Sequence, residues 1–127
     1  MIIKQLSVFL QNESGRLVNV TDILHKADIN ISALSIAETE EYGILRMIVS
    51  DTEKAAQALK AADYTIKISD VICIVTPDIP GALSAALKKL AAAGIDVSYM
   101  YGYSSDGKAR LVIKTSDPAA ASALLEA

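Results

Sequence analysis

The sequence predicts an α+β fold in which a unit of strand, helix, strand, strand and helix occurs twice, in residues 1–69 and 70–127. Sliding the chain along itself by 66 positions aligns residues 1–61 with 67–127 without a gap, and thirteen of the 61 pairs are identical. Each copy also has an apolar run, then a polar loop with a glycine, then an amphipathic segment. Internal repetition of this kind indicates a duplicated supersecondary unit.

Each copy begins with a strand and a helix. The apolar, β-branched runs at 5–10 and 71–76 are typical of buried strands. Asp28 and Gly94 are expected to end the helices that follow. The apolar positions of these helices have the spacing of one helix face: Leu17, Val20 and Leu24 in the first copy, and Leu83, Leu87 and Leu90 in the second.

Each copy continues with two strands joined by a polar turn, and then a second helix. The strand pairs are expected at 31–38 with 44–50 and at 97–103 with 109–115, and the pair Asp106-Gly107 strongly indicates a hairpin. The second helices should start after the N-caps Asp51 and Asp117, with Pro118 in the first helical turn.

This order is that of the ferredoxin-like βαββαβ arrangement, with antiparallel sheets and two helices on one face of each sheet. The third strands agree, because Leu45, Met47, Val49, Leu111 and Ile113 alternate with Arg46, Arg110 and Lys114. A fourth strand is expected at 64–69, whereas its counterpart in the second copy would fall near 130–135. We therefore expect residues 1–4, or a partner chain, to cover that strand edge.

Composition argues against several classes of function. The net charge is −3 with scattered basic residues, which disfavours nucleic-acid binding. No apolar run reaches the length of a membrane span, and a cytoplasmic location is expected. The single cysteine, Cys73, excludes an internal disulfide, and no metal, cofactor or catalytic motif is recognisable. The chain is therefore not expected to be an enzyme.

The chain resembles the ACT domain, a ligand-sensing βαββαβ module, and in particular small proteins that consist of two ACT repeats without a catalytic domain. The resemblance depends on the strand-to-helix loops "QNESGRL" and "PDIPGAL", with Asn or Asp three residues before Gly. It also depends on "ADINISAL" and "AGIDVSYM", which lead into each second strand. Ser14 stands where the family often has proline, and Leu10 stands where some relatives have histidine.

The resemblance implies that an amino acid binds at an interface between ACT units, through the loop of one unit and the start of a second strand. The implied ligand-binding residues are Asn12, Ser14, Gly15, Arg16, Leu17, Asn30 and Ile31 in the first copy, and Asp78, Gly81, Ala82, Leu83 and Asp96 in the second. A regulated protein partner and a homodimer are also implied.

These residue types suit an amino acid. Backbone amides at a helix N-terminus attract a carboxylate, and a glycine lets the ligand approach them. Asn12 and Asn30 offer donors and acceptors, whereas Asp78 and Asp96 offer only acceptors, so the two sites should differ. The alternative is structural: Asn12 and Asp78 could cap helices, and the glycines could simply form the turns.

Two further features have structural interpretations. Tyr99, Tyr101 and Tyr103 alternate along one strand and should lie on the open sheet face beside Arg110 and Lys114. They favour a contact with another sheet or subunit over an RNA-stacking surface. His25, near a helix end, is interpreted as structural.

The expected function is therefore amino-acid sensing, with occupancy passed to a partner protein. One alternative is a ferredoxin-like interaction module without a ligand. Another is an enzyme of the acylphosphatase type, which the lack of an Arg and Asn set on a phosphate loop disfavours.

Overall fold

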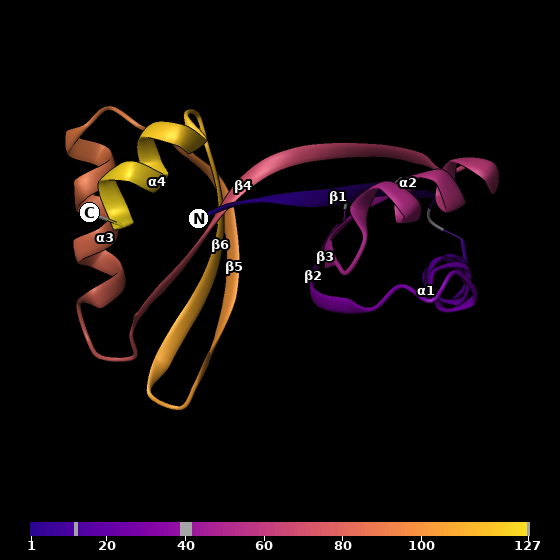
Figure 1. The fold of residues 1–127 in the computed structure, drawn as a ribbon, viewed down its shortest axis with the longest axis horizontal. Helices are drawn as coiled ribbons and strands as arrows, with labels where there is room; N and C mark the ends of the chain where they lie inside the picture. Colours follow the sequence, from indigo (N-terminus) through magenta and orange to yellow (C-terminus); the bar gives the residue numbers. More distant parts are fainter. Residues whose placement is uncertain (12, 39–41, 127) are drawn as a thin grey trace. The chain divides into compact units, whose positions relative to one another are not determined.

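The structure is a computed structural model that describes residues 1–11, 13–38 and 42–126. Its elements follow the order strand, helix, strand, strand, helix twice along the chain (Figure 1). The elements are β1 (Ile2–Gln11), α1 (Arg16–Lys26), β2 (Ile31–Glu38), β3 (Tyr42–Val49), α2 (Thr52–Ala61), β4 (Thr65–Pro77), α3 (Ala82–Ala92), β5 (Val97–Ser105), β6 (Lys108–Thr115) and α4 (Pro118–Glu126).

The chain divides into two compact units. The N-terminal unit is formed by Lys4–Ser69, and the C-terminal unit is formed by Asp70–Ala127 together with Met1–Ile3. Strands β1 and β4 therefore each contribute residues to both units. No chain break or linker separates the repeats, because β4 runs from one into the other.

The N-terminal unit has the strand order β2-β3-β1-β4, with β1 and β2 both antiparallel to β3. In the register Leu6 lies opposite Met47 and Val8 opposite Leu45, so these side chains share one face of the sheet. Helices α1 and α2 cover that face with Val20, Leu24, Ala55 and Leu59. The expected alternation on the third strand and the expected helical layer are confirmed.

The C-terminal unit has the order β1-β4-β6-β5, and β6 is antiparallel to β4 and β5. Ile72 lies opposite Ile113, and both pack with Leu90 of α3 and Ala121 of α4. In Figure 1 the helices α3 and α4 lie together on one side of this sheet. The same layers therefore form in each repeat from different side chains.

The expected helix and turn signals are confirmed. The Asp51 carboxylate accepts a hydrogen bond from the Lys54 amide at 3.1 Å, and Asp117 accepts one from the Ala120 amide at 3.1 Å. Asp106 and Gly107 have φ values of 56° and 74°, as a two-residue hairpin turn requires. Asp28 and Gly94 follow α1 and α3 with φ values of 59° and 71°.

The edge of β4 in the C-terminal unit is covered as expected by the first residues of the chain. The Cys73 amide donates to the Met1 carbonyl at 2.8 Å, and the Met1 ammonium donates to the Cys73 carbonyl at 3.2 Å. The Met1 ammonium also pairs with the Glu126 carboxylate at the end of α4. Residues Met1–Ile3 thus occupy the fourth-strand position of this unit.

Two expectations were wrong in detail. The strands expected at 64–69 and 71–76 form one strand, β4. The residues at the junction are Ser69 and Asp70, and neither is a glycine or proline that would interrupt a strand. Leu17 and Leu83 were expected to share one apolar helix face with the leucines and valine that follow them, but they are 40% and 39% exposed, whereas Val20, Leu24 and Leu90 are buried. Both lie in the first helical turn, beside a surface hollow, while residues one turn later reach the core.

Candidate functional site

The loop between the first strand and the first helix turns at a glycine in both repeats. Gly15 and Gly81 are the N-caps of α1 and α3, with φ values of 82° and 88°. These positive values favour glycine, so the expectation that the glycines form the turns is confirmed. Their carbonyl oxygens accept the amides of Asn19 and Ala85, each at 2.9 Å. Asp78 is not the N-cap of α3, because Gly81, three residues later, holds that position.

A hollow of about 140 Å³ lies beside this loop in the N-terminal unit. Its walls come from the end of β1, the first turn of α1 and the two strand ends at the tip of the β2–β3 hairpin. The lining residues are Leu10, Gln11, Glu13, Arg16, Leu17, Ile36, Glu38, Tyr42 and Gly43. The register explains this meeting, because Gly43 lies opposite both Leu10 and Glu38.

The C-terminal unit has a hollow of about 240 Å³ at the same place. Seven of its lining residues are 66 positions after residues that line the first hollow: Thr76, Pro77, Ile79, Leu83, Gly102, Ser104 and Ala109. The remaining three are Asp78, Tyr103 and Leu111. The two repeats therefore place an equivalent concave surface next to an equivalent helix N-terminus.

The two hollows differ in polarity. The first contains one cation, Arg16, and two carboxylates, Glu13 and Glu38. The second contains a single carboxylate, Asp78, among mostly apolar or neutral side chains. A ligand with strongly polar ends would therefore find complementary charges of both signs only in the first hollow.

Asn30, Ile31 and Asp96 lie away from these hollows within their own units. Asn30 and Ile31 are at the start of β2, whereas Ile36 and Glu38 near its end line the hollow. The Asn30 amide donates to the Ser50 hydroxyl at 2.9 Å, and the Asp96 amide donates to the Ser116 hydroxyl at 3.0 Å. The structure therefore leaves the side chains of Asn30 and Asp96 at the end of the unit opposite the loop.

The other residues expected at the site gather at the loop or line the hollow. Arg16, Leu17, Asp78 and Leu83 line the two hollows, and the exposed Ser14 and Gly81 lie in the loops. Ala82 begins α3 and lines a neighbouring hollow of about 320 Å³. Asn12 lies outside the described residues. Ile36, Glu38 and Gly43 were missed, and only the hairpin register could have indicated them.

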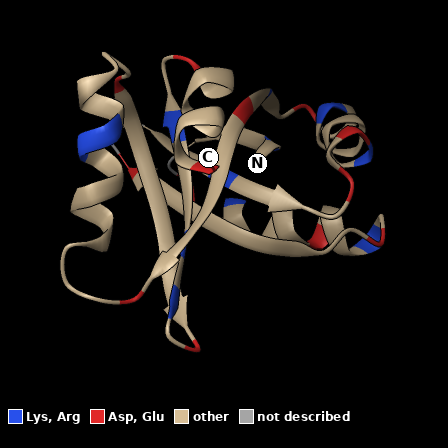
Figure 2. Ribbon diagram, turned by 60° about the vertical axis from the view of Figure 1, so that its left-hand side comes forward, with Lys and Arg blue, Asp and Glu red and all other residues tan. Residues whose placement is uncertain are grey.

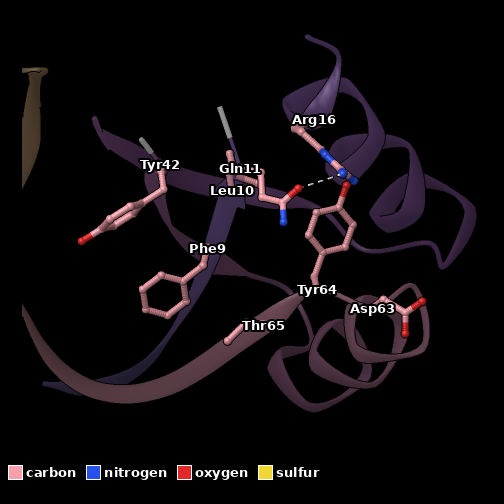
Figure 3. Close-up of a pocket in the computed structure, with 8 residues that line it drawn as sticks. All are labelled: Phe9, Leu10, Gln11, Arg16, Tyr42, Asp63, Tyr64 and Thr65. Atoms are coloured by element: carbon pink, nitrogen blue, oxygen red, sulfur yellow. Dashed lines mark hydrogen bonds between the residues drawn. The ribbon is translucent and has the colours of Figure 1, made fainter. Parts of the chain in front are cut away.

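A larger hollow of about 350 Å³ adjoins the loop hollow in the N-terminal unit and shares Arg16 with it (Figure 3). Phe9, Leu10, Gln11, Arg16, Tyr42, Asp63, Tyr64 and Thr65 line it. Arg16 Nη2 donates to Gln11 Oε1 at 3.3 Å and to Glu13 Oε2 at 3.0 Å.

The position of Arg16 is also defined by Tyr64. The guanidinium carbon is 6.0 Å from the centre of the Tyr64 ring, and the Tyr64 hydroxyl accepts a hydrogen bond from Asn19 Nδ2 at 2.6 Å. The Tyr64 hydroxyl, and then the charge of Glu13, raise the pKa of Arg16 above its ordinary value. Arg16 is therefore a fixed cation between two hollows.

The three alternating tyrosines lie on the sheet face opposite the helices, as expected. Tyr99 is opposite Lys114, and Tyr103 is opposite Arg110. Tyr99 and Tyr101 are partly buried, whereas Tyr103 is 57% exposed. Tyr103 and Ser104 also place the tip of this strand beside the second hollow.

Charged side chains are spread over both units. Figure 2 shows Lys and Arg and Asp and Glu as short bands scattered over a ribbon of mostly other residues. Within residues 1–11, 13–38 and 42–126, no group of three or more His, Cys, Asp or Glu side chains is placed to hold a metal ion. No helix in this part of the chain is long and apolar enough to cross a membrane.

The fold is a tandem pair of ferredoxin-like βαββαβ units, each with an equivalent hollow beside its strand-to-helix loop. The family model described as an ACT domain pair matches residues 1–126, and the chain belongs to this family. The match leaves no space for a catalytic domain within the 127 residues. No curated protein matches the chain.

Solved structures give the same fold. The chain is 46% identical to protein BT0572 from Bacteroides thetaiotaomicron, with a TM-score of 0.94 over 99% of this chain and 88% of that one. The regulatory subunit of aspartate kinase from Thermus thermophilus is 14% identical, with a TM-score of 0.69 over 99% and 95% of the two chains. The corresponding Thermus flavus subunit is 14% identical, with a TM-score of 0.71 over 99% and 92%.

Proposed function

We propose that the protein is an amino-acid sensor that binds its ligand at the strand-to-helix loops and transmits occupancy to a regulated protein partner. The observation that carries this proposal is the recurrence of one hollow at equivalent positions of both repeats. Membership of the ACT domain pair family and the likeness of the fold to aspartate kinase regulatory subunits support it.

The chemistry of the loop suits the carboxylate of the ligand. The first turn of α1 or α3 directs backbone N–H groups toward the hollow, and the helix dipole favours an anion there. Gly15 and Gly81 have open space where a Cβ would be, so a ligand can approach the backbone closely. No charged side chain is required for this contact, which explains why the second hollow can function with few charges.

Asn30 and Asp96 are proposed to bind the ligand's ammonium group from another ACT unit. They lie at the end of their own unit opposite the loop, separated from it by a helix of 11 residues in each repeat. One ligand can contact both groups only when they come from different units. A homodimer that binds the ligand between ACT units would satisfy this geometry. The protein is proposed to act in the cytoplasm.

The test is a thermal-shift and calorimetry screen of the twenty amino acids. A ligand at one hundred times its dissociation constant should add about 2.7 kcal/mol to the free energy of unfolding. Glu38→Tyr and Ser104→Tyr place a ring in the first and second hollow. Ala37→Tyr and Ser105→Tyr make the same change on adjacent exposed positions of the opposite face.

Loss of binding in Glu38→Tyr or Ser104→Tyr with retention in its control identifies the occupied repeat. Asn30→Ala should weaken binding, while Gln57→Ala on the exposed surface of α2 should not. If none of the twenty amino acids changes the melting temperature, the sensor proposal fails and the ligand-free interaction module becomes the better description.

A further inference from the structure

We infer that the 350 Å³ hollow behind Arg16 is a second ligand site, specific to the first repeat, that binds a small aromatic carboxylate. The carboxylate contacts the Arg16 guanidinium, and the ring of the ligand packs against Phe9 and Tyr42. This hollow shares Leu10, Gln11, Arg16 and Tyr42 with the loop hollow, whereas Phe9, Tyr64 and Thr65 line this hollow alone of the two.

The cation is already oriented for a second partner. Arg16 Nη2 donates to Gln11 and Glu13, and the Tyr64 hydroxyl is a further partner of the guanidinium. A guanidinium has five N–H donors in a rigid fork, which matches the geometry of a carboxylate. Because this fork has more N–H donors than these three contacts use, and Arg16 lines this hollow, a carboxylate bound there can accept a hydrogen bond from the guanidinium beside Tyr64.

The aromatic wall follows from the strand register. Phe9 lies opposite Ile44, and Gln11 lies opposite Tyr42, so Phe9 and Tyr42 are diagonal neighbours on one sheet face. Diagonal side chains on neighbouring strands are about 7–8 Å apart at the backbone, within reach of aromatic rings. Phe9 is 40% exposed and Tyr42 is 45% exposed, so ring surface is accessible in the hollow. Figure 3 shows both rings on the side of the hollow away from Arg16.

The second repeat is an internal contrast. The residues 66 positions after Phe9, Gln11, Arg16 and Tyr42 are Val75, Pro77, Ala82 and Lys108. The hollow that shares three of these four positions there is lined by Ile74, Val75, Ile79, Ala82, Ala86 and other mostly aliphatic residues. The guanidinium and the two rings therefore occur together only in the first repeat, which is why the ligand class is assigned to that repeat alone.

The chain offers a site-specific probe for this hollow. Phe9 is its only phenylalanine and lines this hollow but not the loop hollow. Incorporation of 4-fluorophenylalanine therefore gives one ¹⁹F signal. Titration with 3-phenylpropanoate should shift this signal saturably, whereas propanoate, which has no ring, should shift it at least about tenfold less effectively.

Substitutions distinguish the contribution of the Arg16 charge from that of packing against the Tyr42 ring. Arg16→Gln should weaken 3-phenylpropanoate binding about tenfold or more, because a hydrogen-bonded charge is lost. Tyr42→Ala should also weaken it. Arg110→Gln removes one arginine in the other unit, at a position that lines none of the hollows described, and should leave binding unchanged. Circular dichroism establishes that each variant is folded.

Phenylalanine and 3-phenylpropanoate both carry a ring and a carboxylate, but only phenylalanine has an ammonium group. Comparing them distinguishes an amino acid from a simple aromatic acid as the ligand. If phenylalanine and 3-phenylpropanoate both shift the Phe9 signal and both require Arg16, the proposal stands for either source. If only phenylalanine shifts it, the ammonium group is the determinant and the proposal is wrong. Absence of any shift, or an equal shift in Arg16→Gln, also overturns it. Because Arg16 and Tyr42 also line the first loop hollow, the loop sites are tested separately by Glu38→Tyr and Ser104→Tyr, which change residues that do not line this hollow.

Discussion

The Cys73 amide donates a hydrogen bond to the Met1 carbonyl at 2.8 Å, across 72 positions of sequence. This contact makes the first three residues part of the C-terminal unit, although the rest of β1 belongs to the N-terminal one. An edge strand of three residues protects the backbone of β4 at this point and depends on few side-chain contacts.

Deletion of residues 1–3, with a new initiating Met before Lys4, should expose this edge. Each lost backbone hydrogen bond is worth about 0.5–1.5 kcal/mol, so exchange of the Cys73 amide should accelerate several-fold to tenfold. Hydrogen exchange followed by NMR measures this directly. Glu126→Gln is the control, because it removes the exposed ion pair to the terminal ammonium and keeps a side-chain oxygen that can accept the hydrogen bond from Ser122 Oγ. Unchanged Cys73 protection after the deletion would contradict the assigned strand.

Removal of either helix cap should cost stability. Asp51→Ala and Asp117→Ala each leave a helical amide without its side-chain acceptor, and each should lower the free energy of unfolding by about 1 kcal/mol. Urea denaturation measures the change. The matched variants Asp51→Asn and Asp117→Asn keep a capping oxygen and should lose clearly less. Equal losses in the Ala and Asn variants would show that the caps act through charge instead.

Gly102 should tolerate no side chain. A Cβ at this position would collide with the carbonyl oxygen of Arg110 on the paired strand β6. Gly102→Ala should therefore destabilise the protein by about 1–3 kcal/mol. Gly43→Ala is the control within the other hairpin, where the nearest atom to an added Cβ would be 3.6 Å away. Thermal unfolding compares the two, and similar melting temperatures would disprove the assigned strand contact.

Loss of the Tyr64 hydroxyl should weaken the contact between Asn19 of α1 and the segment that follows α2. Tyr64→Phe removes the acceptor of the 2.6 Å hydrogen bond from Asn19 and should lower the free energy of unfolding by about 1 kcal/mol. Asn19→Ala should have a similar effect, and the double variant should lose little more than either single one. Additive losses in such a double-mutant cycle would mean that the two side chains act independently.

Binding of an aromatic carboxylate behind Arg16 should be insensitive to pH near neutrality. The pKa of Arg16 is raised by Tyr64 and Glu13, so the guanidinium stays protonated at and well above neutral pH. Affinity should therefore be constant between about pH 6 and 9, and should fall in acid as the ligand's carboxylate is protonated near pH 4–5. Titrations of the Phe9 signal across this range test the predicted pH dependence of the affinity. A loss of affinity above pH 7 would contradict the prediction.

The architecture was predictable because local signals agreed with one another. The thirteen identities at a shift of 66 aligned the two copies, and Asp106-Gly107, Asp51 and Asp117 fixed turns and helix starts. The union of two expected strands into β4 was not predictable from composition alone, because Ser69-Asp70 is compatible with either a turn or an extended strand.

The candidate site was predictable only at the loop. Gly15 and Gly81 could be identified because a positive φ favours glycine, and a glycine at the same place in both repeats is visible in the sequence. Ile36, Glu38 and Ser104 become neighbours of the loop only through pairing across the hairpin, and no local pattern records that proximity. Tyr64 joins Arg16 through the end of α2, a contact over 48 positions of sequence that periodicity cannot indicate.

Strand β4 extends over 13 residues and supplies ladder positions to both repeats without interruption. A slip of its pairing by a single residue would turn Ile72 and Ile74 outward and at the same time reverse the inward and outward positions of Thr65–Ser69. Neither repeat can therefore misalign alone. Insertions and deletions should be rarer in this segment than at a hairpin tip during evolution. One added residue in β4 would exchange buried and exposed side chains in both repeats at once.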